Sequence, residues 1–188
     1  MGDSIHDRGR AMEDLFFQQK DQQLLEKLKS ELSMKESRDQ LEQASGIHDR
    51  DVLNQLIEHG VTVETLLSVG MIPLVAVAWA DNVLQPAERK SIMQAAESSG
   101  IAPDSTAYKL LESWLQERPD RSLLVAWELY IKSLKSQVDV LAFNQLKSQV
   151  LDRAEKVADS AGGFLGMGNR VSEAERRVLN ELKAVFES

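Results

Sequence analysis

Four acidic residues near two turns are the side chains of this sequence best suited to hold a ligand. Asp81 follows an apolar run and precedes Glu88, and Asp159 and Glu175 repeat this order near the C-terminal end. Carboxylates at turns are ligands that Ca²⁺ and Mg²⁺ prefer. An aspartate at a helix C-terminus is disfavoured by the helix dipole, and a bound cation would offset that cost. The pattern therefore predicts a divalent metal cation as the cofactor, held by Asp81, Glu88, Asp159 and Glu175.

The two acidic segments read as copies of one helix–turn–helix unit. The first copy runs from Ala80-Asp81 to Glu88-Arg89, and the second runs from Ala158-Asp159 to Glu175-Arg176. The second turn is longer by nine residues, 161–169, which include four glycines. If the copies are equivalent, the aspartates lie at matching helix ends and the glutamates lie in matching first turns.

Helix capping explains the two glutamates without any ligand. Ser172 followed by Glu175 has the spacing of a capping box, and Gln85 followed by Glu88 has the same layout with a proline at the first helical position. The complete spacing of a calcium-binding loop is absent. Capping is therefore the first explanation of the glutamates, and the two aspartates are the residues that favour a cation.

Other kinds of chemistry find no support in the sequence. The chain has no cysteine, which removes thiolate metal sites and cysteine nucleophiles. His6, His48 and His59 all lie in the polar N-terminal third, and none has a partner at metal-ligand spacing. The glycine-rich stretch lacks the strand and the GK[ST] motif of a phosphate loop. We expect a protein that is not an enzyme.

Composition limits the partners. The net charge of −8 argues against nucleic acid and anionic membranes, and the 43% hydrophobic content provides a core. The longest apolar run, 69–80, is shorter than the roughly 20 residues that span a bilayer. The polar N-terminus does not resemble a signal peptide. We expect a cytoplasmic protein with a protein partner and without membrane insertion.

The elements that position the acidic residues are predicted to be helices throughout, because helix-forming residues dominate and strand-like alternation is missing. We expect an all-α helical bundle with an internal repeat, preceded by a long N-terminal helix. The division is predicted near 61–70, giving an arm over 1–66 and a bundle over 67–188. Helices are expected at about 7–32, 35–45, 49–60, 71–80, 86–99, 104–116 and 173–186, with one or two more over 120–160. Asp49 and Asp104 are the expected N-caps of the helices that they begin.

The segment from Val77 to Glu88 resembles the core motif of the TerB-like family, which is named for tellurite-resistance proteins. Asn82 stands where that family has glycine, and asparagine also tolerates a left-handed turn. The likeness covers about 70–186. It implies an all-helical bundle, an acidic face that binds divalent metal at the positions of Asp81, Glu88, Asp159 and Glu175, and a place in stress-response or membrane-linked signalling complexes.

The first third resembles, more faintly, the zeta-type inhibitory subunit of alphaproteobacterial ATP synthases. The likeness rests on Asp7-Arg8, Ala11, Glu13 and Phe16, and on matches at Asp21, Lys27, 51–53 and 60–61. The arginine- and asparagine-rich segment of that family is missing. The resemblance implies a helix that inserts into a partner.

Two functions follow as expectations. The first is a cytoplasmic helical scaffold or sensor that responds to a cation and docks a protein, or a second copy of itself, through its N-terminal helix. The alternative is a regulatory inhibitor of a large ATPase that acts through the same helix.

Overall fold

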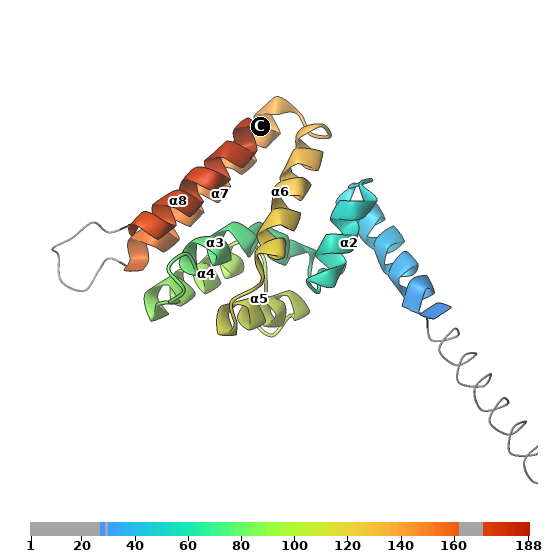
Figure 1. The fold of residues 1–188 in the computed structure, drawn as a ribbon, viewed down its shortest axis with the longest axis horizontal. Helices are drawn as coiled ribbons and strands as arrows, with labels where there is room; N and C mark the ends of the chain where they lie inside the picture. Colours follow the sequence, from blue (N-terminus) through green and yellow to red (C-terminus); the bar gives the residue numbers. More distant parts are fainter. Residues whose placement is uncertain (1–26, 29, 162–170) are drawn as a thin grey trace, which may run out of the picture. The chain divides into compact units, whose positions relative to one another are not determined.

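The computed structural model describes residues 27–28, 30–161 and 171–188. All regular structure in these residues is helical, which confirms the all-α prediction (Figure 1). The chain divides into two units, Met1–Gln40 and Leu41–Ser188. Most of the long helix predicted over 7–32 lies outside the described residues, as does the glycine-rich stretch 162–170.

In the first unit the described residues are helical, without a break from 30 to 40. Residues 41–45 of the second unit are helical as well. The interruption predicted at 33–34 is therefore wrong, because neither residue there is a proline or a glycine. Lys27 and Glu31 form an exposed ion pair of 3.9 Å along this helix. The apolar side chains Leu28 and Leu32 are 46% and 61% exposed.

The second unit begins earlier than the boundary predicted from composition. Leu41, Ile47 and Leu53 are fully buried in its core, as are Leu56 and Val61. The helix α2, Arg50–Glu58, has Asp49 as its N-cap as predicted, and the Asp49 carboxylate accepts the backbone N–H groups of residues 51 and 52. Residues 41–66 therefore belong with the bundle, because their apolar side chains are buried in its core.

The remaining elements follow the predicted order closely. They are the 3₁₀ helix η1, Leu66–Met71, and the α-helices α3, Ile72–Ala78; α4, Pro86–Ser98; α5, Thr106–Gln116; α6, Arg121–Lys135; α7, Val140–Ala161; and α8, Glu173–Glu187.

Local sequence explains where these helices start. Pro73 and Pro86 lie in the first turns of α3 and α4, where a missing N–H costs nothing. Asp120 caps α6 through the N–H of Ser122, at 2.9 Å. At α5 the predicted cap is wrong, because Asp104 has a left-handed φ of 67° and Ser105 caps the helix instead.

The apolar run 69–80 forms the centre of the bundle. Six of the seven residues of α3 are buried, and α3 packs against α4, α6, α7 and α8. The helix α7 packs in turn against α4 and α8, and α7 and α8 run side by side in Figure 1. Edge-to-face packing of Trp127 on Phe186, with ring centroids 5.8 Å apart, joins α6 to α8. Two helical hairpins, α3–α4 and α7–α8, thus share one core.

Candidate functional site

The turn between α3 and α4 holds Asp81 at the surface. The Asp81 carboxylate accepts the backbone N–H of Val83 at 3.0 Å, which closes a tight side-chain turn. The next residue, Asn82, has a φ of 69°, a left-handed conformation that asparagine tolerates. Asp81 is thus stabilised within its own turn, and its position after α3 does not by itself require a bound cation.

Glu88 is the third residue of α4 and closes the predicted capping box. Its Oε2 accepts the backbone N–H of Gln85 at 2.8 Å. The side chain is only 2% exposed. A surface glutamate would suffice for capping, so the burial of this carboxyl group is an additional property of the fold.

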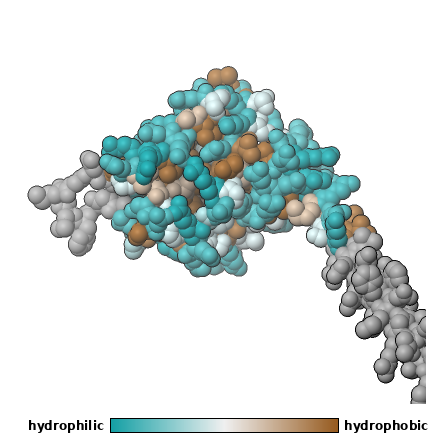
Figure 2. Space-filling view, viewed as in Figure 1, coloured by the Kyte–Doolittle hydropathy of each residue, from teal (hydrophilic) through white to brown (hydrophobic). Residues whose placement is uncertain are grey.

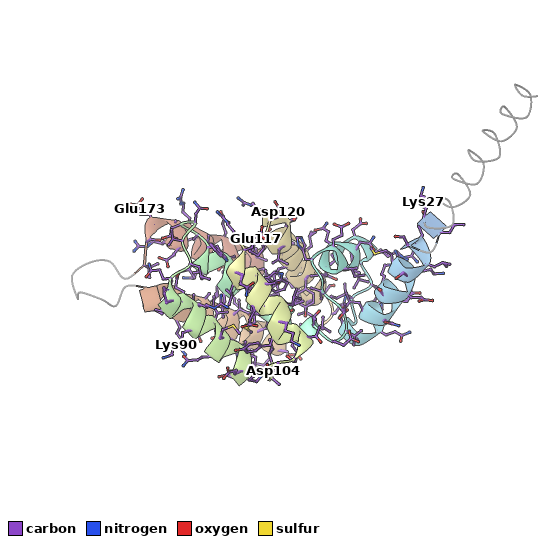
Figure 3. The ribbon with its side chains drawn as sticks, turned by 90° about the horizontal axis from the view of Figure 1, so that it is seen from below. Lys27, Lys90, Asp104, Glu117, Asp120 and Glu173 are labelled. Carbon is purple, nitrogen blue, oxygen red and sulfur yellow. The ribbon has the colours of Figure 1, made fainter. Side chains whose placement is uncertain are left out.

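Glu175 occupies the matching position at the start of α8. Its Oε2 accepts the backbone N–H of Ser172 at 2.5 Å, and the Ser172 hydroxyl accepts the N–H of Glu175 at 3.2 Å. It is 5% exposed. Glu173, two positions earlier, lies at the outer surface (Figure 3). The two capping boxes therefore bury one carboxyl group each.

The structure brings these two carboxyl groups together. The side chains of Glu88 and Glu175 lie within hydrogen-bonding reach of each other. Burial, with smaller contributions from Glu175 and Asp81, raises the pKa of Glu88 from 4.5 to about 7, against the opposing effect of the Gln85 N–H. Two carboxyl groups can hydrogen-bond to each other only if one of them carries a proton. We call Glu88 and Glu175 the glutamate pair.

Arg89, the residue next to Glu88, binds α5. Arg89 donates from Nη1 to the carbonyl of Leu115 at 3.1 Å and lies 3.9 Å from Glu112. Trp79 donates its indole N–H to the carbonyl of Trp114 at 2.9 Å. The residues flanking Asp81 and Glu88 therefore hold the C-terminal end of α5, and no basic side chain is among the groups that shift the pKa of Glu88.

The fourth predicted ligand lies in different surroundings. Asp159 is exposed in the last turn of α7. It lines a surface hollow of about 260 Å³ together with Glu155, Arg176 and Lys183. Lys183 pairs with Glu155 at 3.2 Å. Asp159 thus has cationic neighbours, and it is not among the groups that shift the pKa of Glu88.

A four-carboxylate cation site stays a prediction. Within the described ranges, no group of three or more histidine, aspartate or glutamate side chains is placed to hold a metal ion. The glutamate pair offers two carboxyl groups, and Mg²⁺ is commonly held by one or two carboxylates with water completing its shell. Because both residues are nearly buried, a hydrated cation would reach them only after a local opening of the structure.

Sequence reasoning identified both glutamates and missed their contact. Their helices are separated by 75 residues or more along the chain, so no local spacing reveals that the two first turns meet. The one signal available was the repeated pattern itself, because related hairpins packed about a twofold axis bring equivalent residues face to face.

Comparison with known proteins gives no family for the chain. No protein-family model, no curated protein and no solved structure matches it. Among the described helices, none has both the length and the apolar content needed to cross a bilayer.

Proposed function

We propose that this protein is a non-enzymatic helical scaffold whose glutamate pair acts as a sensing element. The observation that carries the proposal is the meeting of two nearly buried carboxyl groups, Glu88 and Glu175, in the first turns of two helices. Two ionised carboxylates at this place would repel each other, since the surrounding protein screens charge less than water does. A proton or a cation between them would relieve this repulsion.

The cation is the ligand that would make the pair a sensor. With a pKa of about 7, Glu88 loses its proton within the neutral pH range, so a cation competes there with a single proton. In this proposal Glu88 and Glu175 are ligands, and Asp81, the third carboxylate acting on Glu88, joins them when its turn opens. Binding would change the packing of α4 against α7.

Calorimetric titration with Ca²⁺, Mg²⁺, Mn²⁺ and Zn²⁺ tests this function. The expected result is saturable heat with at least one metal and a higher melting temperature in its presence. The variants Glu88→Gln and Asp81→Asn should each weaken binding at least tenfold. Glu173→Gln is the matched control, because it removes the same charge from the exposed face of α8.

Two results would contradict the cation proposal. One is the absence of both heat and a melting shift at millimolar metal. The other is unchanged affinity in Glu88→Gln, which would place any bound metal elsewhere. An Asp159→Asn variant tests the fourth predicted ligand separately, and the position of Asp159 beside Arg176 and Lys183 predicts unchanged binding.

The internal repeat supports the same proposal. We infer that the α3–α4 and α7–α8 hairpins are equivalent, because each second helix starts with a capping box whose glutamate is buried. The packing has the corresponding symmetry, since α3 contacts α4 and α8 while α7 contacts α8 and α4. This arrangement fits the TerB-like resemblance, and with it a role in stress response, as parts of the proposal.

The N-terminal helix is the proposed arm for docking a protein or a second copy of the chain. Leu28 and Leu32, one turn apart, expose apolar surface on a charged helix. Removing residues 1–34 leaves the core of the second unit, which begins at Leu41. Pull-downs should then lose their partners, and gel filtration should show a smaller assembly if the arm self-associates.

An unchanged partner list and an unchanged assembly size would contradict the docking role. Capture of the catalytic subunits of a large ATPase by the full chain, and not by the shortened one, would favour the alternative of a regulatory inhibitor.

A further inference from the structure

A surface hollow beside α3 and α6 lies apart from the glutamate pair. It contains about 100 Å³ of space for water. Engineered apolar cavities of about 150 Å³ bind benzene, so this hollow matches one bulky side chain and is too small for most metabolites. Its lining consists of Ile72, Val75, Ala76, Trp79, Arg118, Pro119, Asp120, Arg121, Leu123 and Leu124.

Five of the ten lining residues are aliphatic side chains of α3 and α6, and they form the apolar part of the hollow. The indole N–H of Trp79 is already used by the carbonyl of Trp114, so the ring contributes apolar surface to the wall. Burying one further leucine or phenylalanine side chain here would stabilise a complex, because it removes apolar surface from water.

Charged residues also line the hollow, and they differ in whether they are already paired within the protein. The Asp120 carboxylate accepts both the N–H and the hydroxyl of Ser122, which holds it at the start of α6. Arg121 and Glu181 form an exposed ion pair of 3.7 Å. Arg118 is exposed and forms no ion pair within the described part of the chain. A ligand carboxylate would therefore meet an available guanidinium group at the hollow.

The helix α6 extends this surface. Its buried face carries Leu123, Ala126, Trp127 and Ile131, yet the neighbouring Leu124 is only half-buried and Val125 is 39% exposed. Figure 2 shows apolar surface over α6 on a face that is otherwise mostly hydrophilic. A helix with apolar residues outside its core-facing stripe is typical of a contact surface.

We infer that the hollow between α3 and α6 is an anchor site for an acidic segment of a protein partner. One leucine- or phenylalanine-sized side chain of the segment fills the hollow, and a flanking carboxylate binds Arg118. Small, deep anchor pockets surrounded by polar groups are the usual centres of protein interfaces. This site does not depend on the proposed cation binding, since it shares no residue with the glutamate pair.

Nuclear magnetic resonance titration of the full chain tests the inference. The probe is a capped hexapeptide in which two glutamates stand on each side of a Leu-Phe dipeptide. We expect saturable shifts of the Trp79 indole N–H and of the Ala76 methyl group below about 5 mM peptide, as the weak affinity of a single anchor requires. Replacing Leu-Phe by Ala-Ala, or the glutamates by lysines, should weaken binding at least tenfold.

Two variants locate the site. Arg118→Glu reverses an exposed charge and should weaken binding of the acidic probe at least fivefold, whereas Arg177→Glu, the same change on α8 outside the hollow, should leave it unchanged. Ala76→Phe fills the hollow and should abolish binding, with far-ultraviolet circular dichroism confirming the fold. Equal binding of the lysine peptide, shifts confined to other surfaces, or no shift at 5 mM would overturn the inference.

Discussion

Glu88 is more deeply buried than its capping role requires. A cap needs only one carboxylate oxygen near the backbone N–H of Gln85, and an exposed side chain provides that. Here the carboxyl group is placed against Glu175, and its pKa rises from 4.5 to about 7. The fold thus tolerates an electrostatic cost at this position, and functional sites are where such costs concentrate.

The raised pKa predicts how stability depends on pH. The folded protein holds the Glu88 proton more tightly than the unfolded chain does, so the associated stability is complete below about pH 4.5 and is lost as the pH rises through 7. A rise of the pKa from 4.5 to about 7 corresponds to a loss of about 3 kcal/mol. Urea denaturation between pH 5 and 8.5 should show this slope, and Glu88→Gln should remove it and be the more stable protein at pH 8.

The comparison needs a control for the charge change itself. Glu173→Gln removes one exposed carboxylate from the same turn as Glu175, and it should keep the pH slope of the unmodified protein. A Glu88→Gln variant with the same slope as that control would show that Glu88 titrates normally in the fold.

At the residue scale, the sequence predicted the caps and missed the contacts. Ser172, Glu175, Gln85 and Glu88 were assigned from spacing alone, because a capping box is a local interaction over three residues. Burial and the contact between the two glutamates depend on how distant hairpins pack, which local spacing does not specify.

At the element scale, the sequence predicts the turn after α3 correctly, but it misplaces the start of α5 and adds a helix break at 33–34. The turn after α3 follows from Asn82, whose side chain tolerates a left-handed backbone. The cap of α5 was assigned one residue too early, since Asp104 and Ser105 are both good capping residues and only tertiary contacts choose between them. The break at 33–34 had no proline or glycine to cause it.

The turn after α3 gives a prediction at this scale. Because Asn82 has a φ of 69°, Asn82→Gly should leave the free energy of unfolding within about 0.5 kcal/mol of the original value. Asn82→Ala should cost about 1–2 kcal/mol, since alanine is strained in this conformation. Thermal denaturation followed by circular dichroism measures both; equal melting temperatures for the two variants would contradict the left-handed turn.

At the scale of the whole molecule, the second unit is held together by one shared core in which α3 is central and α6 joins α8. That all-α architecture was predictable from composition and helical spacing. The extent of the bundle was not predictable, because residues 41–61 are polar in average composition and still bury six aliphatic side chains. Composition averages over a segment, whereas burial depends on which face of each helix meets the core.

The contact between α6 and α8 gives the prediction at this scale. Trp127 is 1% exposed and packs edge-on against Phe186. Trp127→Ala should therefore destabilise the second unit by about 3–5 kcal/mol. Val125→Ala, on the same helix at an exposed position, should change stability by less than about 0.5 kcal/mol. Urea denaturation followed by far-ultraviolet circular dichroism distinguishes the two, and similar midpoints would place Trp127 outside the core.

The central claim is that Glu88 and Glu175 form one responsive unit, and a carbon-13 nuclear magnetic resonance titration of the glutamate carboxyl groups tests it most directly. The account predicts that the Glu88 resonance titrates near pH 7, that Glu175→Gln lowers this midpoint, and that a binding divalent cation lowers it further. A Glu88 midpoint near 4.5, unchanged by Glu175→Gln and by metal, would contradict the account.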